Sequence, residues 1–105
     1  MKIVASSALI ETGFSAALDV SGTDEVSVYL NASVVTGTDP TLDIVIQDSP
    51  NGVDWYDHTT FTQKTAVGME VKRLTNFGKF LRAKYTITGT DPSFTAEILA
   101  VGRNI

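Results

Sequence analysis

VSVYLNASVVTGTDPTLDIVIQ, residues 26–47, is the stretch that decides the fold. Apolar residues take every second position from Val26 to Val34 and again from Leu42 to Ile46, and mostly polar residues fall between them. This alternation is typical of β-strands with one face buried and the other in water. The intervening Thr-Gly-Thr-Asp-Pro has the composition of a turn. The stretch therefore predicts two strands joined by a turn.

The same period of two extends through the rest of the chain. It recurs over residues 14–20, 81–87 and 94–98, and no window of a dozen residues carries an apolar stripe at helical spacing. The Ala-rich segment 5–17 is interpreted as strand because Gly13 and a pair of serines interrupt it. The N-terminus is too polar for a targeting segment and is expected to form the first strand.

The predicted fold is all-β: one domain over residues 1–105, an antiparallel β-sandwich, jelly-roll-like, with about seven or eight short strands. The apolar alternants should form its core. They are Leu18, Val28, Leu30, Leu42, Ile44, Ile46, Phe61, Leu81, Ala83, Tyr85, Phe94 and Ile98.

One motif occurs twice, and we call its two copies the twin motifs. Residues 35–42, VTGTDPTL, recur at residues 87–94 as ITGTDPSF. Each copy is expected to end one strand and begin the next, since glycine allows positive φ, aspartate caps its own turn and proline fixes φ. Either one favourable turn was used twice, or an old duplication left two equivalent hairpins. In both cases the two loops could form a joint surface at one end of the domain.

Residue inventory argues against an enzyme and against bound cofactors. The chain has no cysteine and one histidine, His58, which we interpret as an ordinary surface residue. It lacks a nucleophile elbow and a glycine-rich phosphate loop. The expectation is therefore no catalytic residue, no cofactor and no metal. Carboxylate-pair glycosidases, which need only two acidic residues, are the weakest point of that exclusion.

Charge is divided along the chain. Residues 1–63 hold nine acidic residues and one basic residue, a net charge of −8, whereas residues 64–105 hold seven basic and three acidic residues, a net charge of +4. The total of −4 disfavours nucleic acid and anionic membranes as partners. The basic residues either pair with carboxylates across the sheet or meet the acidic part of a neighbouring subunit.

A polar turn is predicted between two strands over residues 48–57. Asp48, Asn51, Asp54 and Asp57 gather there, and their oxygens could bind calcium or simply build the turn. Trp55 has two interpretations. Alternation puts it on the face of Phe61, which favours the core, whereas an exposed Trp55 could stack on a sugar ring.

Two segments carry resemblances to known proteins. IQDSPNGVDW (residues 46–55) and FGKFLRAKY (residues 77–85) resemble the hairpin and a later strand of discoidin-like, galactose-binding β-sandwiches. That resemblance implies a glycan site at Asn51, Asp54, Trp55 and Tyr56. A second resemblance is carried by TDPTLDIVIQDSP (residues 38–50), WY (55–56), FTQ (61–63), FGKFLR (77–82) and GTDPSFT (89–95). Over residues 26–98 the chain looks like small all-β proteins of tailed bacteriophages, some of which decorate capsids.

The second resemblance implies a non-enzymatic virion protein, assembled in the bacterial host cytoplasm. It implies a capsid decoration or stabilisation protein that binds the major capsid protein as a homo-oligomer, with a trimer favoured by the threefold points of a capsid; a tail location is the alternative. The expected interaction residues are the central five residues of each twin motif and a basic strip: Thr36, Gly37, Thr38, Asp39, Pro40, Thr88, Gly89, Thr90, Asp91, Pro92, Lys72, Arg73, Lys79 and Arg82. The N-terminal segment is expected to contribute as well.

Overall fold

The computed structural model describes the backbone of residues 2–104 and the side chains of residues 9–104, and this part of the chain is all β, without a helix. The strands are β1 (Lys2–Leu9), β2 (Gly13–Phe14), β3 (Leu18–Asp19), β4 (Glu25–Ser49), β5 (Tyr56–Thr60), β6 (Gly68–Leu74) and β7 (Phe80–Arg103). Every pairing between them is antiparallel. The expectation that the N-terminal segment forms a strand is confirmed by β1.

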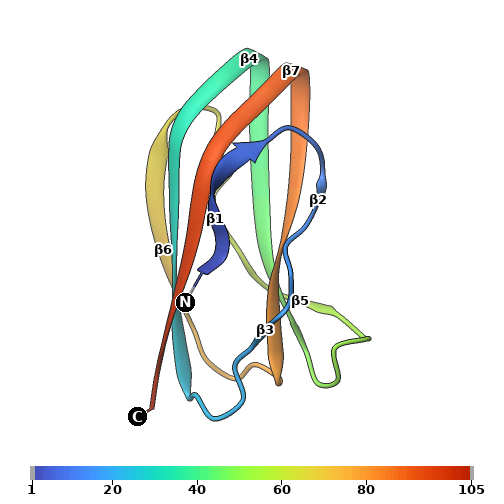
Figure 1. The fold of residues 1–105 in the computed structure, drawn as a ribbon, viewed down its shortest axis with the longest axis vertical. Coiled ribbons are helices and arrows are strands. Elements are labelled where there is room, and N and C mark those ends of the chain that lie inside the picture. Colours follow the sequence, from blue (N-terminus) through green and yellow to red (C-terminus); the bar gives the residue numbers. More distant parts are fainter. Residues whose placement is uncertain (1, 105) are drawn as a thin grey trace.

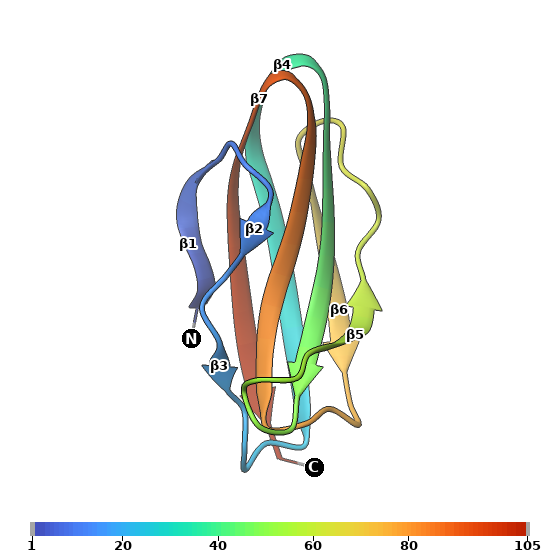
Figure 2. The same ribbon diagram turned by 90° about the vertical axis from the view of Figure 1, so that its right-hand side faces the viewer.

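Two long strands, β4 and β7, form the backbone of the sheet. They pair along their whole length, from Glu25 opposite Arg103 to Ser49 opposite Phe80. Midway, both strands bend over together, so that the two halves of the ladder run back beside each other (Figures 1 and 2). In one half the strand order is β1-β7-β4-β6, and in the other β7 and β4 lie between β2 with β3 on one side and β5 on the other.

The bend falls at the twin motifs, which were predicted to be turns between separate short strands. That prediction is wrong in one respect: each motif lies inside a continuous strand, and the two motifs pair with each other across the ladder, with Thr36 opposite Ser93 and Thr38 opposite Thr90. Register shifts between residues 36 and 41 accompany the bend. A local turn signal cannot distinguish the two cases, because the hydrogen-bond partners that keep the strand continuous lie about 50 positions away in the sequence.

The two glycines of the twin motifs permit this close pairing. Gly37 has φ +108°, and a Cβ there would lie 2.7 Å from the carbonyl oxygen of Asp91. Gly89 has φ +124°, and its Cβ would lie 2.9 Å from the carbonyl oxygen of Asp39. Each glycine thus packs on the Asp-Pro of the other copy. The two contacts are reciprocal, so an approximate twofold axis between the motifs relates one copy to the other. Equivalent residues of the two copies are 52 positions apart in the sequence.

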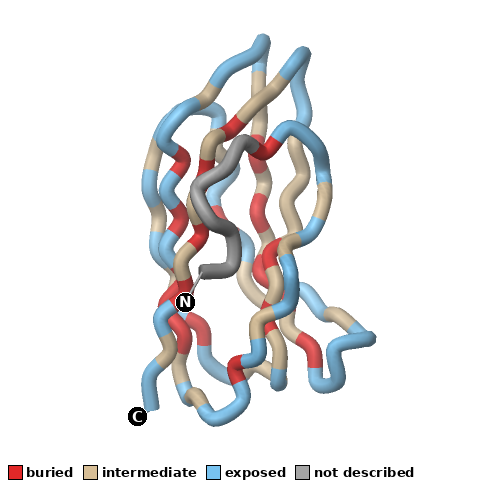
Figure 3. The backbone as a smooth tube through the Cα atoms, in the orientation of Figure 1, coloured by how far each residue is buried: buried red, intermediate tan, exposed pale blue. Residues whose placement is uncertain are grey.

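One hydrophobic cluster joins the two halves of the sheet. Buried residues alternate along both arms of β4 and of β7 (Figure 3). Most of the predicted core is confirmed as buried: Val28, Leu30, Leu42, Ile44, Ile46, Phe61, Leu81, Ala83, Phe94 and Ile98. Leu18 and Tyr85 are only partly buried and pack against this cluster.

Gln47 departs from the expected alternation, since its position on the wet face predicts exposure. It is buried, because its amide lies under other side chains of that face: Nε2 donates to Asp57 Oδ1 (2.8 Å) and Oε1 accepts from Arg82 Nε (2.9 Å). An amide whose nitrogen and oxygen are both hydrogen-bonded can be buried at little cost.

The bend gives a test. Gly37→Ala should destabilise the protein by roughly 2–5 kcal/mol, because a strained positive φ and a clash with backbone atoms add. Gly22→Ala is the matched control: Gly22 also has positive φ, +85°, but nothing lies within 4 Å of the place its methyl group would take, so only the conformational cost of about 1–2 kcal/mol applies. Urea unfolding of both variants measures the difference. Equal costs would contradict the close pairing of the twin motifs.

Candidate interaction surfaces

The bent end of the molecule, formed by residues 36–40 and 88–92, is an exposed polar tip. Most of its residues are exposed, and Pro40 and Pro92 are half-buried. Asp39 and Asp91 hold φ values of 49° and 48°, and just below the tip the hydroxyls of Thr41 and Thr88 hydrogen-bond to each other. The predicted joining of the two loops at one end of the domain agrees with this geometry (Figure 1).

Two shallow grooves flank the tip, one beside each motif. One is lined by Asp39, Pro40, Thr41 and Thr65, and the other by Ile10, Glu11, Asp91, Pro92 and Ser93; each has a volume of about 370 Å³. The motif residues in the two grooves are equivalent positions of the repeat. The residues that line both grooves include carboxylates and no basic side chain, so the tip suits a partner that donates hydrogen bonds or carries positive charge.

A cation lies between two aromatic rings on the arm of the ladder that is flanked by β2, β3 and β5. The guanidinium carbon of Arg82, on β7, is 4.0 Å from the ring centre of Phe14 and 4.2 Å from that of Trp55. Arg82 is held in place by its hydrogen bond to the buried Gln47. We call Phe14, Arg82, Trp55 and Gln47 the arginine stack.

The interpretation of Trp55 as a core residue is wrong. Trp55 is half-buried, lies against Arg82 and does not belong to the hydrophobic cluster. The cause is a β-bulge: Ile46 pairs with Thr59 and Gln47 with Asp57, so His58 is an extra residue that shifts the alternation between Phe61 and Trp55. No local feature of the sequence signals this bulge.

His58 is a structural residue rather than an ordinary surface histidine. Its Nε2 lies 2.8 Å from the carbonyl oxygen of Thr75, which can only accept, so Nε2 donates. Its Nδ1 then accepts from the Thr59 hydroxyl at 2.7 Å, and the ring meets Phe77 edge-on. The side chain ties β5 to the segment that leads into β7.

The polar side chains of the 48–57 turn make their hydrogen bonds within the protein, several of them within the turn itself. Asn51 Oδ1 accepts from the backbone amides of Val53 and Asp54, both at 2.9 Å, and Asn51 Nδ2 donates to Asp54 Oδ2. Asp48 instead accepts from the Gly78 amide, and Asp57 from Gln47. Of the four oxygen-bearing residues considered for calcium, Asn51 and Asp54 contact each other, whereas Asp48 and Asp57 have other partners. The described residues contain no cluster of three or more acidic or histidine side chains that could hold a metal.

The predicted basic strip is not one surface. Lys72 lies on the inner side of β6, 3.4 Å from Glu70, whereas Arg73 next to it points outward. Lys79 precedes β7 with its ammonium 5.4 Å from the Phe80 ring centre, and Arg82 lies in the arginine stack on the other arm of the ladder. Neighbouring strand residues point to opposite faces, so alternation alone could have separated Lys72 from Arg73.

Sequence reasoning missed an ion cluster around Glu70. Lys64 Nζ lies 2.5 Å from Glu70 Oε1, Lys72 approaches the other carboxylate oxygen, and the Thr62 amide also donates to the carboxylate. Burial raises the pKa of Glu70, but the hydrogen bonds and charge of Lys64, with Thr62 and Lys72, outweigh it and hold the pKa below its ordinary value. The sequence contained a signal for this cluster: Glu70 is the only acidic residue between positions 64 and 90, so nearby basic residues could be expected to pair with it.

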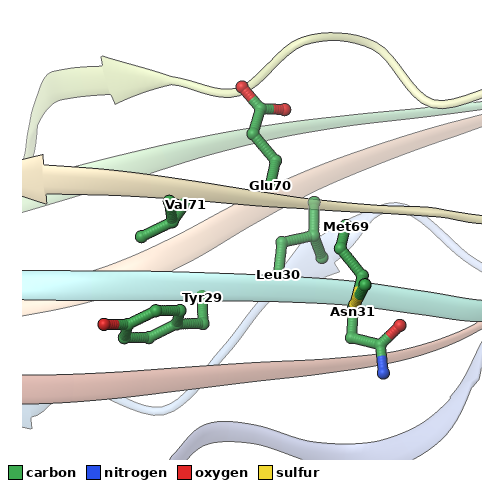
Figure 4. Close-up of a pocket in the computed structure, with 6 residues that line it drawn as sticks. All are labelled: Tyr29, Leu30, Asn31, Met69, Glu70 and Val71. Atoms are coloured by element: carbon green, nitrogen blue, oxygen red, sulfur yellow. The ribbon is translucent and has the colours of Figure 1, made fainter.

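Sequence reasoning also missed an apolar groove on the outer face of β4 and β6. Tyr29, Met69 and Val71 are 42%, 79% and 38% exposed, and with Leu30, Asn31 and Glu70 they line a groove of about 270 Å³ (Figure 4). Tyr29 was placed on a wet face by its alternation, and the pairing of Tyr29 with Val71 brings two such residues together.

No model of a protein family matches the chain, and no curated protein matches it. In the described residues, no helix is long and apolar enough to cross a membrane.

The arginine stack can be tested through the single tryptophan of the chain. Arg82→Ala should cost about 1–3 kcal/mol, because it removes the cation from two rings and leaves the buried Gln47 oxygen without its donor. Trp55 emission should shift to the red as water reaches the ring. Lys84→Ala, two residues along the same face of β7, is the control and should leave the emission unchanged. An unchanged spectrum for Arg82→Ala would contradict the stack.

The Glu70 cluster predicts a pH dependence. Because the folded-state pKa of Glu70 is lowered, its stabilisation is complete above the unfolded-state value near 4.5 and is lost as pH falls through the folded value. Glu70→Gln should destabilise the protein by roughly 1–3 kcal/mol at pH 7, and its deficit relative to the wild type should shrink as pH drops below 4.5. Glu11→Gln, at an exposed position, is the control. Urea midpoints at several pH values give the comparison; a pH-independent deficit would contradict the ionic role.

Proposed function

We propose that the fold is a β-sandwich of the jelly-roll type and that the chain is a virion structural protein of a tailed bacteriophage. The fold proposal is supported by the bent β4–β7 ladder, whose two arms each gain flanking strands. Counting each arm separately and β2 with β3 as one strand gives eight strands in two groups of four, β1-β7-β4-β6 and β2/β3-β7-β4-β5. A double-sheet jelly roll has this kind of arrangement.

Within the virion, we propose a capsid decoration or stabilisation protein that binds the major capsid protein as a homo-oligomer. The observation that carries this proposal is the tip. Its backbone is fixed by the close pairing of Gly37 and Gly89 with the opposite motif, and its threonine and aspartate side chains are largely exposed. A surface that is rigid before binding loses little conformational entropy on binding. Many copies with modest individual contacts would gain avidity on a capsid lattice.

The resemblance to small phage proteins supplies the class of partner, and the tip is a surface suited to it. A binding role is also consistent with the residue inventory, in which we identify no catalytic constellation. The proposal includes no cofactor, nucleic acid or membrane, and places the protein in the virion after assembly in the host cytoplasm.

The test is to mix the purified protein with empty phage capsids and image them. Regular added density at local threefold or sixfold positions, with the tip toward the capsid, is the expected result. Thr90→Arg, which puts a bulky cation on the exposed tip, should weaken binding at least tenfold. Val53→Arg, in the exposed turn at the opposite end of the molecule (Figure 1), should bind normally. Density confined to the tail would remove the decoration role, and absence of binding to any virion part would overturn the proposal.

A second candidate, a carbohydrate-binding module, is favoured by the partial exposure of Trp55 beside the exposed Tyr56. Against it, Arg82 lies against the Trp55 ring, and Asn51 and Asp54 are hydrogen-bonded within their turn. Glycans that quench Trp55 fluorescence, with loss of quenching in Tyr56→Ala, would support this candidate. No response across a glycan array would remove it.

A further inference from the structure

Strand β6 is an open edge of the sheet. It pairs with β4 without a register shift, from Val26 opposite Leu74 to Ala32 opposite Gly68, and no second strand pairs with it among residues 2–104 (Figure 1). Proteins usually protect such edges with a proline, a bulge, inward-pointing charges or a covering loop, because the unpaired backbone groups can pair with another chain. β6 has neither proline nor bulge. Its inward-pointing charges, Glu70 and Lys72, are of opposite sign, so they can be paired by the same residues of a second copy.

The outer face beside this edge is apolar. Met69 and Val71 of β6 point to the same face as Tyr29 of β4, where they line the groove of Figure 4. Tyr29 is also opposite Leu99 on β7, so Leu99, Tyr29 and Val71 form a cross-strand row that ends at the open edge. An apolar row that runs to an unpaired edge is suited to continuation by another strand.

We propose that two copies of this chain pair through β6, antiparallel, about a twofold axis that passes between the two Val71 residues. The sequence of β6, GMEVKRL, is self-complementary in this arrangement. Glu70 of each copy lies opposite Lys72 of the other, and Met69 lies opposite Arg73. The proposal does not depend on the proposed virion function.

Charge selects this register over its neighbours. Opposed residues in an antiparallel pair point to the same face, so only registers that keep Glu70 and Lys72 on the inner face are allowed. Centring the axis on Glu70 would oppose two glutamates, and centring it on Lys72 would oppose two lysines; like charges directly opposite each other are destabilising. The Val71 register alone gives opposite charges, and Lys72, 38% exposed at its side chain, has room to lie between Glu70 of its own copy and Glu70 of the second.

The resulting assembly extends the sheet across both copies. Four strands of each copy, β1, β7, β4 and β6, would join into one sheet of eight. The row of Leu99, Tyr29 and Val71 would continue across the axis into the same residues in reverse order. A second copy is therefore the occupant that matches the edge in backbone, charge and apolar surface together.

The primary test is the molecular mass in solution as a function of concentration. The wild-type chain should sediment as a dimer. Val71→Lys, which puts two like charges on the axis, should weaken dimerisation by at least tenfold. Val101→Lys is the control, because Val101 is 48% exposed and lies on β7 rather than at the β6 edge. Circular dichroism and thermal melting confirm that both variants fold.

Disulfide trapping tests the register independently of charge. The chain has no cysteine, so a single introduced thiol reports one position. In the proposed dimer, Val71→Cys places two thiols across the axis with Cα atoms about 4.5–5.5 Å apart, within disulfide range. Met69→Cys is the control: Met69 is more exposed than Val71, but its two copies would lie about 13 Å apart along the strands.

Rapid crosslinking of Val71→Cys with little crosslinking of Met69→Cys is the expected result. Stronger crosslinking of Met69→Cys would indicate random collision and overturn the register. A wild-type monomer at tens of micromolar, or a trimer such as the threefold points of a capsid would favour, would overturn the pairing itself.

Discussion

The reciprocal packing of Gly37 and Gly89 is the constraint on which the rest of the structure depends. Each glycine lies against the Asp-Pro backbone of the opposite motif, closer than any side chain would allow. This contact lets β4 and β7 bend at the same level while they remain paired on both sides of the bend. Because they bend together, their inner faces turn toward each other, and Leu30, Ile44, Phe94 and Leu81 enter one cluster. A bend in only one strand would break the ladder at its middle.

Strand faces were predicted well from the sequence, because alternation is a local property. It identified the buried positions of β4 and β7 and the equivalence of the two Gly-Thr-Asp-Pro segments. It could not show that these segments pair with each other, since the same residues also make isolated turns. Likewise, the bulge at His58 reversed the expected side for Trp55, and a bulge depends on the partner strand rather than on the bulged residue.

The surface residues were harder to predict than the core, since a charged side chain takes its role from residues that are distant in the sequence. Arg82 lies between Phe14 and Trp55, which are far from it and from each other along the chain. Glu70 forms ion pairs with Lys64 and Lys72, so these two basic residues stabilise the inner side of the sheet edge. The exposed threonines of the tip and the apolar row of Leu99, Tyr29 and Val71 instead leave two surfaces open, at different places on the molecule.

The β4–β7 ladder also has a consequence for the order in which the chain folds. Ser49 and Phe80, at one end, are 31 positions apart, whereas Glu25 and Arg103, at the other, are 78 apart. Closing the shorter loop costs less chain entropy, so we expect pairing to begin near Ser49 and Phe80 and to zip through the twin motifs toward the termini. The ladder must therefore pass the bend at the twin motifs before β4 and β7 pair in the arm that carries β1. Strand β6 pairs with β4 alone, so its pairing does not wait for that step. With so many distant contacts, folding should take milliseconds to seconds, and stopped-flow refolding would measure it.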